Sequence, residues 1–139
     1  MTESSHGYRS LPHTADLRIH AWAPSQPQCL RTAVLGVRDS IADVTHAPVV
    51  RTVDRMLHAT DNADALARAL DELIYILDVA GLLPLDLTVT AVPEGYWLRM
   101  PMGALADVEL WVTPKAVALQ DLHFAYDGAK WNAAVTIDV

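Results

Sequence analysis

Polar and apolar residues alternate over residues 16–22, which is the pattern of a half-buried β-strand. The apolar side of this segment carries Leu17, Ile19 and Ala21. Asp16 opens the segment on its polar side. We therefore expect a strand that begins with a carboxylate at one edge of a sheet.

Two longer segments carry apolar residues at intervals of three and four, which is typical of amphipathic helices. The first is expected over residues 26–43, where Ser25 is a suitable N-cap and Gln28 completes a capping box. The second follows the cap residues at 60–62 and ends at Gly81. Both helices should bury one face.

The remaining segments favour strands. Residues 48–59 are rich in β-branched side chains and predict one strand or two short ones. Residues 85–90, 96–100 and 108–112 show strand patterns separated by turn residues. We therefore expect an α+β fold in a single domain, residues 1–139, with two amphipathic helices packed on a mostly antiparallel sheet. Residues 1–7 are polar and are expected to form a flexible N-terminal tail.

The C-terminal segment predicts a β-hairpin with Asp127 and Gly128 as its two-residue turn. In that register Tyr126 pairs with Ala129, and Asp138 lies opposite Val117. Lys115 would then be the diagonal neighbour of Asp138 on the same face, within reach of a long side chain. The core face would carry Leu122, Phe124, Tyr126, Trp131, Val135 and Ile137.

Charged residues from both ends of the chain converge if the first and last strands are antiparallel neighbours. Asp16, Asp138 and the terminal carboxylate of Val139 would then gather beside Lys115. Such carboxylates repel one another unless one is protonated or a cation lies between them, and an oxygen-only set suits calcium, magnesium or manganese. His13 could add an imidazole or orient a carboxylate. The alternative is a plain surface ion pair between Lys115 and Asp138, with Asp16 as a loop cap.

Composition narrows the classes of function. The single Cys29 excludes an internal disulfide and a zinc cluster, and the longest apolar stretch is interrupted by charges and proline, so we expect a cytoplasmic protein without membrane contact. The formal charge of −7 and the scattered ten Lys and Arg residues disfavour direct nucleic-acid binding. A cation or a basic partner surface is the better electrostatic match.

Four segments of the chain together resemble the archease family. They are His13-Thr14-Ala15-Asp16, Asp71-Glu72-Leu73-Ile74-Tyr75, Pro114-Lys115-Ala116-Val117 and the ending from Trp131 to Ile137-Asp138-Val139. The resemblance implies an α+β fold and a non-catalytic partner of an RtcB-type tRNA-splicing RNA ligase. Such a partner promotes guanylylation of the ligase's histidine and restores multiple turnover.

The resemblance also implies roles for individual residues. Asp16, Lys115 and Asp138 match the family's functional positions, with both aspartates as ligands of a divalent ion. GTP and RNA would be contacted only through the ligase. Two segments depart from the family pattern, Ala118-Leu119-Gln120 after the lysine and Ala23-Pro24 after the first strand. Two alternatives stay open: a metal-dependent hydrolase in which Lys115 stabilises negative charge, and a chaperone-like module that binds through an apolar patch.

Overall fold

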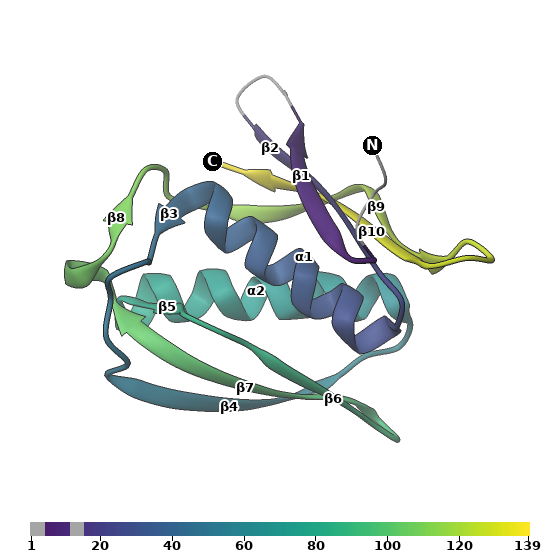
Figure 1. Cartoon of the computed structure of the whole chain (residues 1–139), viewed down its shortest axis with the longest axis horizontal. Helices are drawn as coiled ribbons and strands as arrows, with labels where there is room; N and C mark the ends of the chain where they lie inside the picture. Colours follow the sequence, from purple (N-terminus) through teal and green to yellow (C-terminus); the bar gives the residue numbers. More distant parts are fainter. Residues whose placement is uncertain (1–4, 12–15) are drawn as a thin grey trace.

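Two helices form a middle layer between two antiparallel sheets (Figure 1). The structure is a computed structural model that describes residues 5–11 and 16–139. One sheet consists of four strands in the order β1-β2-β10-β9. Their bounds are β1 Gly7–Leu11, β2 Asp16–Ala23, β9 Ala116–Tyr126 and β10 Trp131–Asp138. The strand that begins at Asp16 is therefore confirmed, and it lies directly beside the last strand of the chain.

The second sheet lies on the other side of the helices (Figure 1). In this sheet β7 pairs with β4 on one edge and with β5 and β6 on the other. Their bounds are β4 Arg51–His58, β5 Leu82–Pro84, β6 Thr88–Val92 and β7 Gly95–Ala104. A separate two-stranded ladder joins β3 Ala42–Asp43 to β8 Glu109–Leu110, and a short 3-10 turn over Leu105–Asp107 precedes β8.

Local capping signals set the helix boundaries. Helix α1 spans Gln26–Ile41, and Ser25 accepts a hydrogen bond from the amide of Gln28 at 3.3 Å. Helix α2 spans Asn62–Ala80 and ends at Gly81, whose φ of 64° is the left-handed conformation that glycine adopts without strain. Within the described residues no helix is long and apolar enough to span a membrane.

The core lies between the helices and the two sheets. Its largest fully buried side chains are Ile19, Leu30, Ile41, Leu66, Leu70, Leu73, Leu83, Leu87, Leu98, Met102 and Ile137. Burying each such side chain stabilises the fold by about 1.5–3 kcal/mol relative to leaving it exposed. A Cβ atom at Gly36 would lie 2.8 Å from the Tyr8 ring, so this glycine in α1 lets β1 approach the helix closely.

The predicted register of the C-terminal hairpin is wrong. Tyr126 pairs with Trp131 instead of Ala129, because the side chain of Asp127 accepts the amides of both Ala129 and Lys130 and closes a four-residue loop. Tyr126 is 54% exposed and does not belong to the core, whereas Phe124 does. The pairing of β10 with β9 changes register a second time between Ala134 and Thr136. At the open end of the hairpin the pairing is therefore only one residue from the predicted one.

Three further features of the fold differ from expectation. Helix α1 ends at Ile41, two residues early, because the next two residues extend to pair with β8. Strand β5 was not predicted, since Leu82–Pro84 is a short, wholly apolar segment without alternation. Gly7, expected in a flexible tail, opens β1 and lies against the ring of Trp22, with 2.7 Å between that ring and an ideal Cβ position.

Candidate functional site

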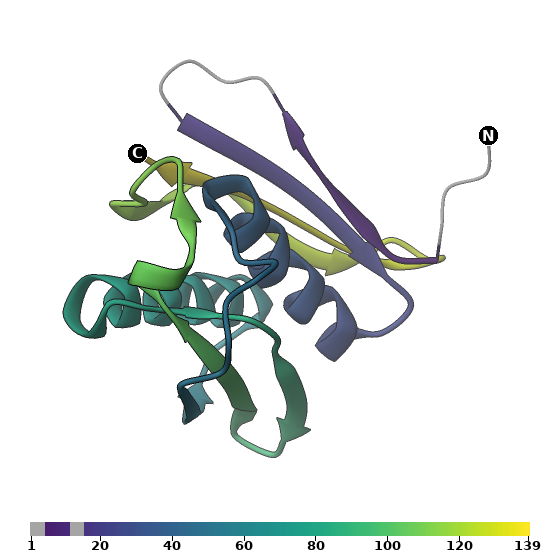
Figure 2. The ribbon, with the colours of Figure 1, turned by 60° about the vertical axis from the view of Figure 1, so that its left-hand side comes forward.

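Asp16 and Asp138 lie directly opposite each other in the ladder between β2 and β10. Directly opposed residues of an antiparallel pair share one face of the sheet, with Cβ atoms about 5 Å apart. Figure 2 shows the end of β10 beside the start of β2, at one end of the sheet. Both aspartates are half-buried. The predicted convergence of the first and last strands is therefore confirmed, and it places two carboxylates at a sheet end.

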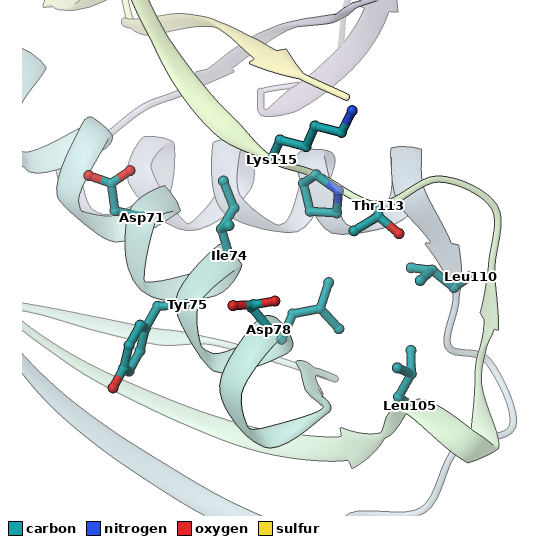
Figure 3. A pocket seen from close by; sticks show the side chains of 10 residues that line it. Asp71, Ile74, Tyr75, Asp78, Leu105, Leu110, Thr113 and Lys115 are labelled. Carbon is teal, nitrogen blue, oxygen red and sulfur yellow. The ribbon is translucent and has the colours of Figure 1, made fainter.

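Lys115 reaches this sheet end through its backbone. Its amide donates a hydrogen bond to the carbonyl oxygen of Asp138 at 2.8 Å. Asp138 pairs with Ala116 rather than Val117, so Lys115 is not the same-face diagonal neighbour that the predicted register requires. Across the described ranges no ion pair within 4.0 Å joins Lys115 to Asp138, and the Lys115 side chain extends toward the end of β10 (Figure 3).

Arg18 is a charged neighbour of the aspartates that sequence reasoning missed. It follows Asp16 by two residues on the same face of β2 and pairs with Thr136, two residues before Asp138. Its guanidinium donates to the Thr136 hydroxyl at 2.9 Å and to the Asp121 carbonyl at 3.2 Å. The alternation of polar and apolar residues puts Arg18 on the same polar face as Asp16, and this pattern could have identified it from the sequence.

The second hydrogen bond of Arg18 depends on an irregularity in β9. Asp121 has a φ of 59°, which is rare for a residue other than glycine. It lies within the segment of β9 where the pairing with β10 changes register between Ala134 and Thr136. The irregular segment therefore brings the Asp121 carbonyl to Arg18, whose guanidinium is held by this carbonyl and by the Thr136 hydroxyl.

The structure does not assign a ligand role to the other two residues of the predicted metal site, His13 and Val139. His13 lies outside the described residues. The side chain of Val139 is half-buried against the core, directly after Asp138. In the part of the chain that the structure describes, no group of three or more His, Cys, Asp or Glu side chains is gathered for a metal ion. Asp16 and Asp138 form an oxygen-only pair of carboxylates, which could hold a hard cation such as Mg²⁺ that retains several waters.

A groove of about 620 Å³ begins beside this site and runs along α2 (Figure 3). Lys115 lines it at one end, together with residues of α2 and of the 105–114 segment. Neither Asp16 nor Asp138 is among the residues that line it. The acidic pair and the groove are therefore neighbouring features, and Lys115 belongs to both.

Comparison with known proteins shows which family the chain belongs to. A sequence model of the Archease protein family (MTH1598/TM1083) matches residues 8–139. The chain belongs to the archease family. The expectation from the sequence motifs is confirmed, and the matched range contains Asp16, Lys115 and Asp138.

Archeases of known sequence resemble the chain over nearly its whole length. The "Probable protein archease" of Mycobacterium tuberculosis strain H37Rv is 43% identical over 137 residues, which cover 98% of this chain and 76% of that protein. The "Protein archease" of Archaeoglobus fulgidus is 25% identical over 136 residues, which cover 95% of this chain and 98% of that protein.

Two solved structures share the fold. The solution structure of Methanobacterium thermoautotrophicum protein 1598 matches with a TM-score of 0.75 and 19% identity, covering 96% of this chain and 99% of that one. The crystal structure of an archease from Thermotoga maritima, described as a possible chaperone, matches with a TM-score of 0.68 and 17% identity, covering 94% and 96%. Both likenesses confirm the α+β fold with two helices on antiparallel sheets.

Proposed function

We propose that this chain is an accessory factor of an RtcB-type RNA ligase in tRNA splicing or RNA repair, and that it promotes guanylylation and multiple turnover of the ligase. Membership of the archease family supports an accessory role. The observation that carries the proposal is the opposition of Asp16 and Asp138 beside Lys115, because these are the three residues that the family resemblance marks as functional.

The acidic pair is suited to hold a divalent cation. Two carboxylates on one face about 5 Å apart repel each other, and a cation between them removes that repulsion. Two carboxylate ligands with bound water fit Mg²⁺ or Mn²⁺, and Ca²⁺ would need further oxygens. The bound ion would supply positive charge for phosphate groups held at the ligase. Asp16 and Asp138 would orient that ion, and Lys115 would contribute a second positive charge.

The position of the pair favours an accessory factor over a hydrolase. Asp16 and Asp138 stand at one end of a sheet, and both side chains are partly exposed. A metal-dependent hydrolase needs an open coordination position inside a concave pocket. The groove lined by Lys115 does not have the two aspartates in its walls. This position supports a role in which the pair acts at another protein's active site.

Guanylylation of a cognate ligase, measured with labelled GTP with and without this protein, tests the proposal. We expect the wild-type chain to raise the rate, and Asp16→Ala, Asp138→Ala and Lys115→Ala each to lose at least about tenfold of the stimulation. The matched control is Asp54→Ala, which removes an exposed carboxylate that lies near Arg99 on the second sheet. An unchanged rate with the wild type, or full stimulation by the aspartate variants, refutes the proposal.

The same assay separates the alternatives. Release of phosphate from a phosphate ester by this chain alone, lost in Asp16→Ala, would favour a hydrolase. Protection of an unfolded client that is unaffected by the aspartate variants would favour a chaperone-like module that binds through exposed apolar side chains. The described surface carries such side chains, including Val79 at 64% and Trp111 at 57% exposure.

A further inference from the structure

The groove between α2 and the 105–115 segment has an apolar floor. Its apolar lining comes from both walls: Ile74, Leu77, Leu105, Leu110 and Pro114. In Figure 3 Ile74 projects from α2 on one wall of the groove, and Leu105 and Leu110 lie on the other wall. Tyr75, also on its rim, is 57% exposed. A volume of about 620 Å³ is sufficient for several side chains of a partner.

Two carboxylates lie on the wall of the groove that α2 forms. Asp71 and Asp78 are seven residues apart on α2, which corresponds to about 10 Å along the helix axis and to the same face. Ile74 lies between them. In Figure 3 the carboxylate of Asp78 points into the space between the two walls. The wall therefore presents negative charge, then an apolar side chain, then negative charge.

The neighbouring basic side chains of α2 and β4 are engaged elsewhere. Arg68 donates to Asp64 at 2.9 Å, one turn before the groove. Arg55 of β4 pairs with Glu72 at 3.2 Å. Within residues 5–11 and 16–139, no ion pair closer than 4.0 Å involves Asp71 or Asp78. A basic partner could therefore supply the two groove carboxylates with a cation that the described residues do not bring within ion-pair distance.

Asp71 is exposed on the groove wall, yet its surroundings already perturb its carboxyl. Partial desolvation raises the pKa of its carboxyl, and the nearby Glu72 acts in the same direction, while Arg68 opposes both. A neutral or acidic partner that covered Asp71 would increase this desolvation. A basic side chain would instead compensate it, so the groove selects for positive charge.

The groove leads to the acidic pair. Lys115 lines the groove at one end, and its amide is bonded to the carbonyl of Asp138. A segment bound along α2 would therefore hold Asp16 and Asp138 against the protein that carries it. This continuity connects a docking surface to the residues that act.

We propose that this groove binds a segment of the partner ligase that carries two basic side chains about 10 Å apart with an apolar side chain between them. The identity of the partner rests on the proposed function. The basic side chains pair with Asp71 and Asp78, and the apolar side chain enters the groove between Ile74 on one wall and Leu105 and Leu110 on the other. The groove provides affinity, and the acidic pair provides the effect on guanylylation.

The test measures binding and stimulation separately. The Kd for the immobilised cognate ligase is determined at several NaCl concentrations for the wild type, for Asp71→Asn/Asp78→Asn and for Asp16→Ala. The matched control, Asp54→Asn/Glu94→Gln, removes two carboxylates that face Arg99 and His58 on the second sheet. Guanylylation is measured with each variant at saturating concentration, and thermal unfolding verifies that each variant is folded.

We expect the groove variant to raise Kd about tenfold at low salt, to weaken its salt dependence, and to stimulate fully when saturating. Asp16→Ala should not stimulate even at saturating concentration, and its Kd should change less than that of the groove variant. An unchanged Kd in the groove variant, or an equal rise in the control, overturns the inference and leaves the proposed function standing. A wild-type chain that binds without stimulating refutes the proposed function, while Kd of the groove variant still decides the inference. No binding by the wild type overturns both.

Discussion

Replacing Asp138 with Asn should stabilise the protein in the absence of divalent ions. Asp138 and Asp16 are directly opposed on one face of the sheet. Like charges in this position destabilise a sheet. The substitution preserves the size of the side chain and removes one of the two charges. The gain in stability would come with loss of function, because the same residue is one of the three proposed to act on the ligase.

The magnitude follows from the spacing of the two side chains. Two unit charges about 5 Å apart repel by about 0.8 kcal/mol at the dielectric constant of water. Arg18 reduces this value, since it is a cationic residue two positions from each aspartate on the same face of the ladder. We therefore expect Asp138→Asn to raise the free energy of unfolding by about 0.5 kcal/mol, which for a chain of this length corresponds to about 2 °C in Tm.

Calorimetry in EDTA at two ionic strengths is the appropriate assay. The stabilisation should be largest near 10 mM NaCl and should vanish near 1 M, where the Debye length is about 3 Å. Asp54→Asn is a control of opposite sign, because Asp54 lies 3.5 Å from Arg99 and loses an attraction. An Asp138→Asn protein that is less stable than the wild type at low salt would show that the two carboxylates do not repel in the folded state.

Three further predictions concern the scaffold. Asp121→Gly should leave stability unchanged or raise it, because glycine adopts the φ of 59° without strain. Asp121→Val should destabilise the protein by about 1–2 kcal/mol, because this φ strains a β-branched residue. Urea unfolding measures both effects. Leu70→Ala should destabilise by about 3 kcal/mol in the same assay, since the side chain is fully buried. Acid should destabilise the fold below about pH 4, because the amides of Lys130 and Ala129 lower the pKa of Asp127 in the folded state. The Asp127 carboxylate therefore adds stability above its ordinary pKa of 3.8, and this stability is lost as the pH falls through the lower pKa of the folded state. Asp127→Asn retains an acceptor for these amides and should lose less stability between pH 7 and pH 3.

Elements with local signals were predictable from the sequence. Ser25 caps α1, and the run at 60–62 contains the cap Asp61 and the start of α2, because a short polar side chain can satisfy a free helical amide without help from the rest of the fold. Gly81 ends α2 for an equally local reason, its positive φ. The alternation that begins at Asp16 reports burial on one side of the strand, and β2 has that pattern.

The hairpin register could not be predicted from its turn residues. Asp127 and Gly128 favour a two-residue turn, but the Asp127 carboxylate also accepts two amides in a four-residue loop, and the sequence does not distinguish these outcomes. The irregularity around Asp121 then moves the register in the opposite direction. These two deviations nearly cancel at the open end, where Asp138 lies opposite Ala116, one residue from the prediction.

This one-residue shift in register changes the position of Lys115, because a shift by one residue moves a side chain to the other face of the strand. The predicted register would have placed the lysine side chain beside Asp138 on the acidic face. In the structure Lys115 precedes β9, bonds Asp138 through the backbone and lines the groove along α2. Lys115 was thus predicted to lie near Asp138, which the backbone hydrogen bond bears out, but the prediction missed that Lys115 also lines the groove.

The topology makes the site dependent on complete folding. Asp16 begins β2 and Asp138 ends β10, so their opposition requires pairing between strands from opposite ends of the chain. Non-local pairing of this kind forms only after the entropy of closing the intervening chain has been overcome. A chain in which β10 has not paired with β2 would still present the helix α2 wall of the groove but not the two opposed carboxylates. Binding of the partner without stimulation is therefore the signature expected of a partly folded sheet, and it distinguishes such a defect from loss of the groove itself.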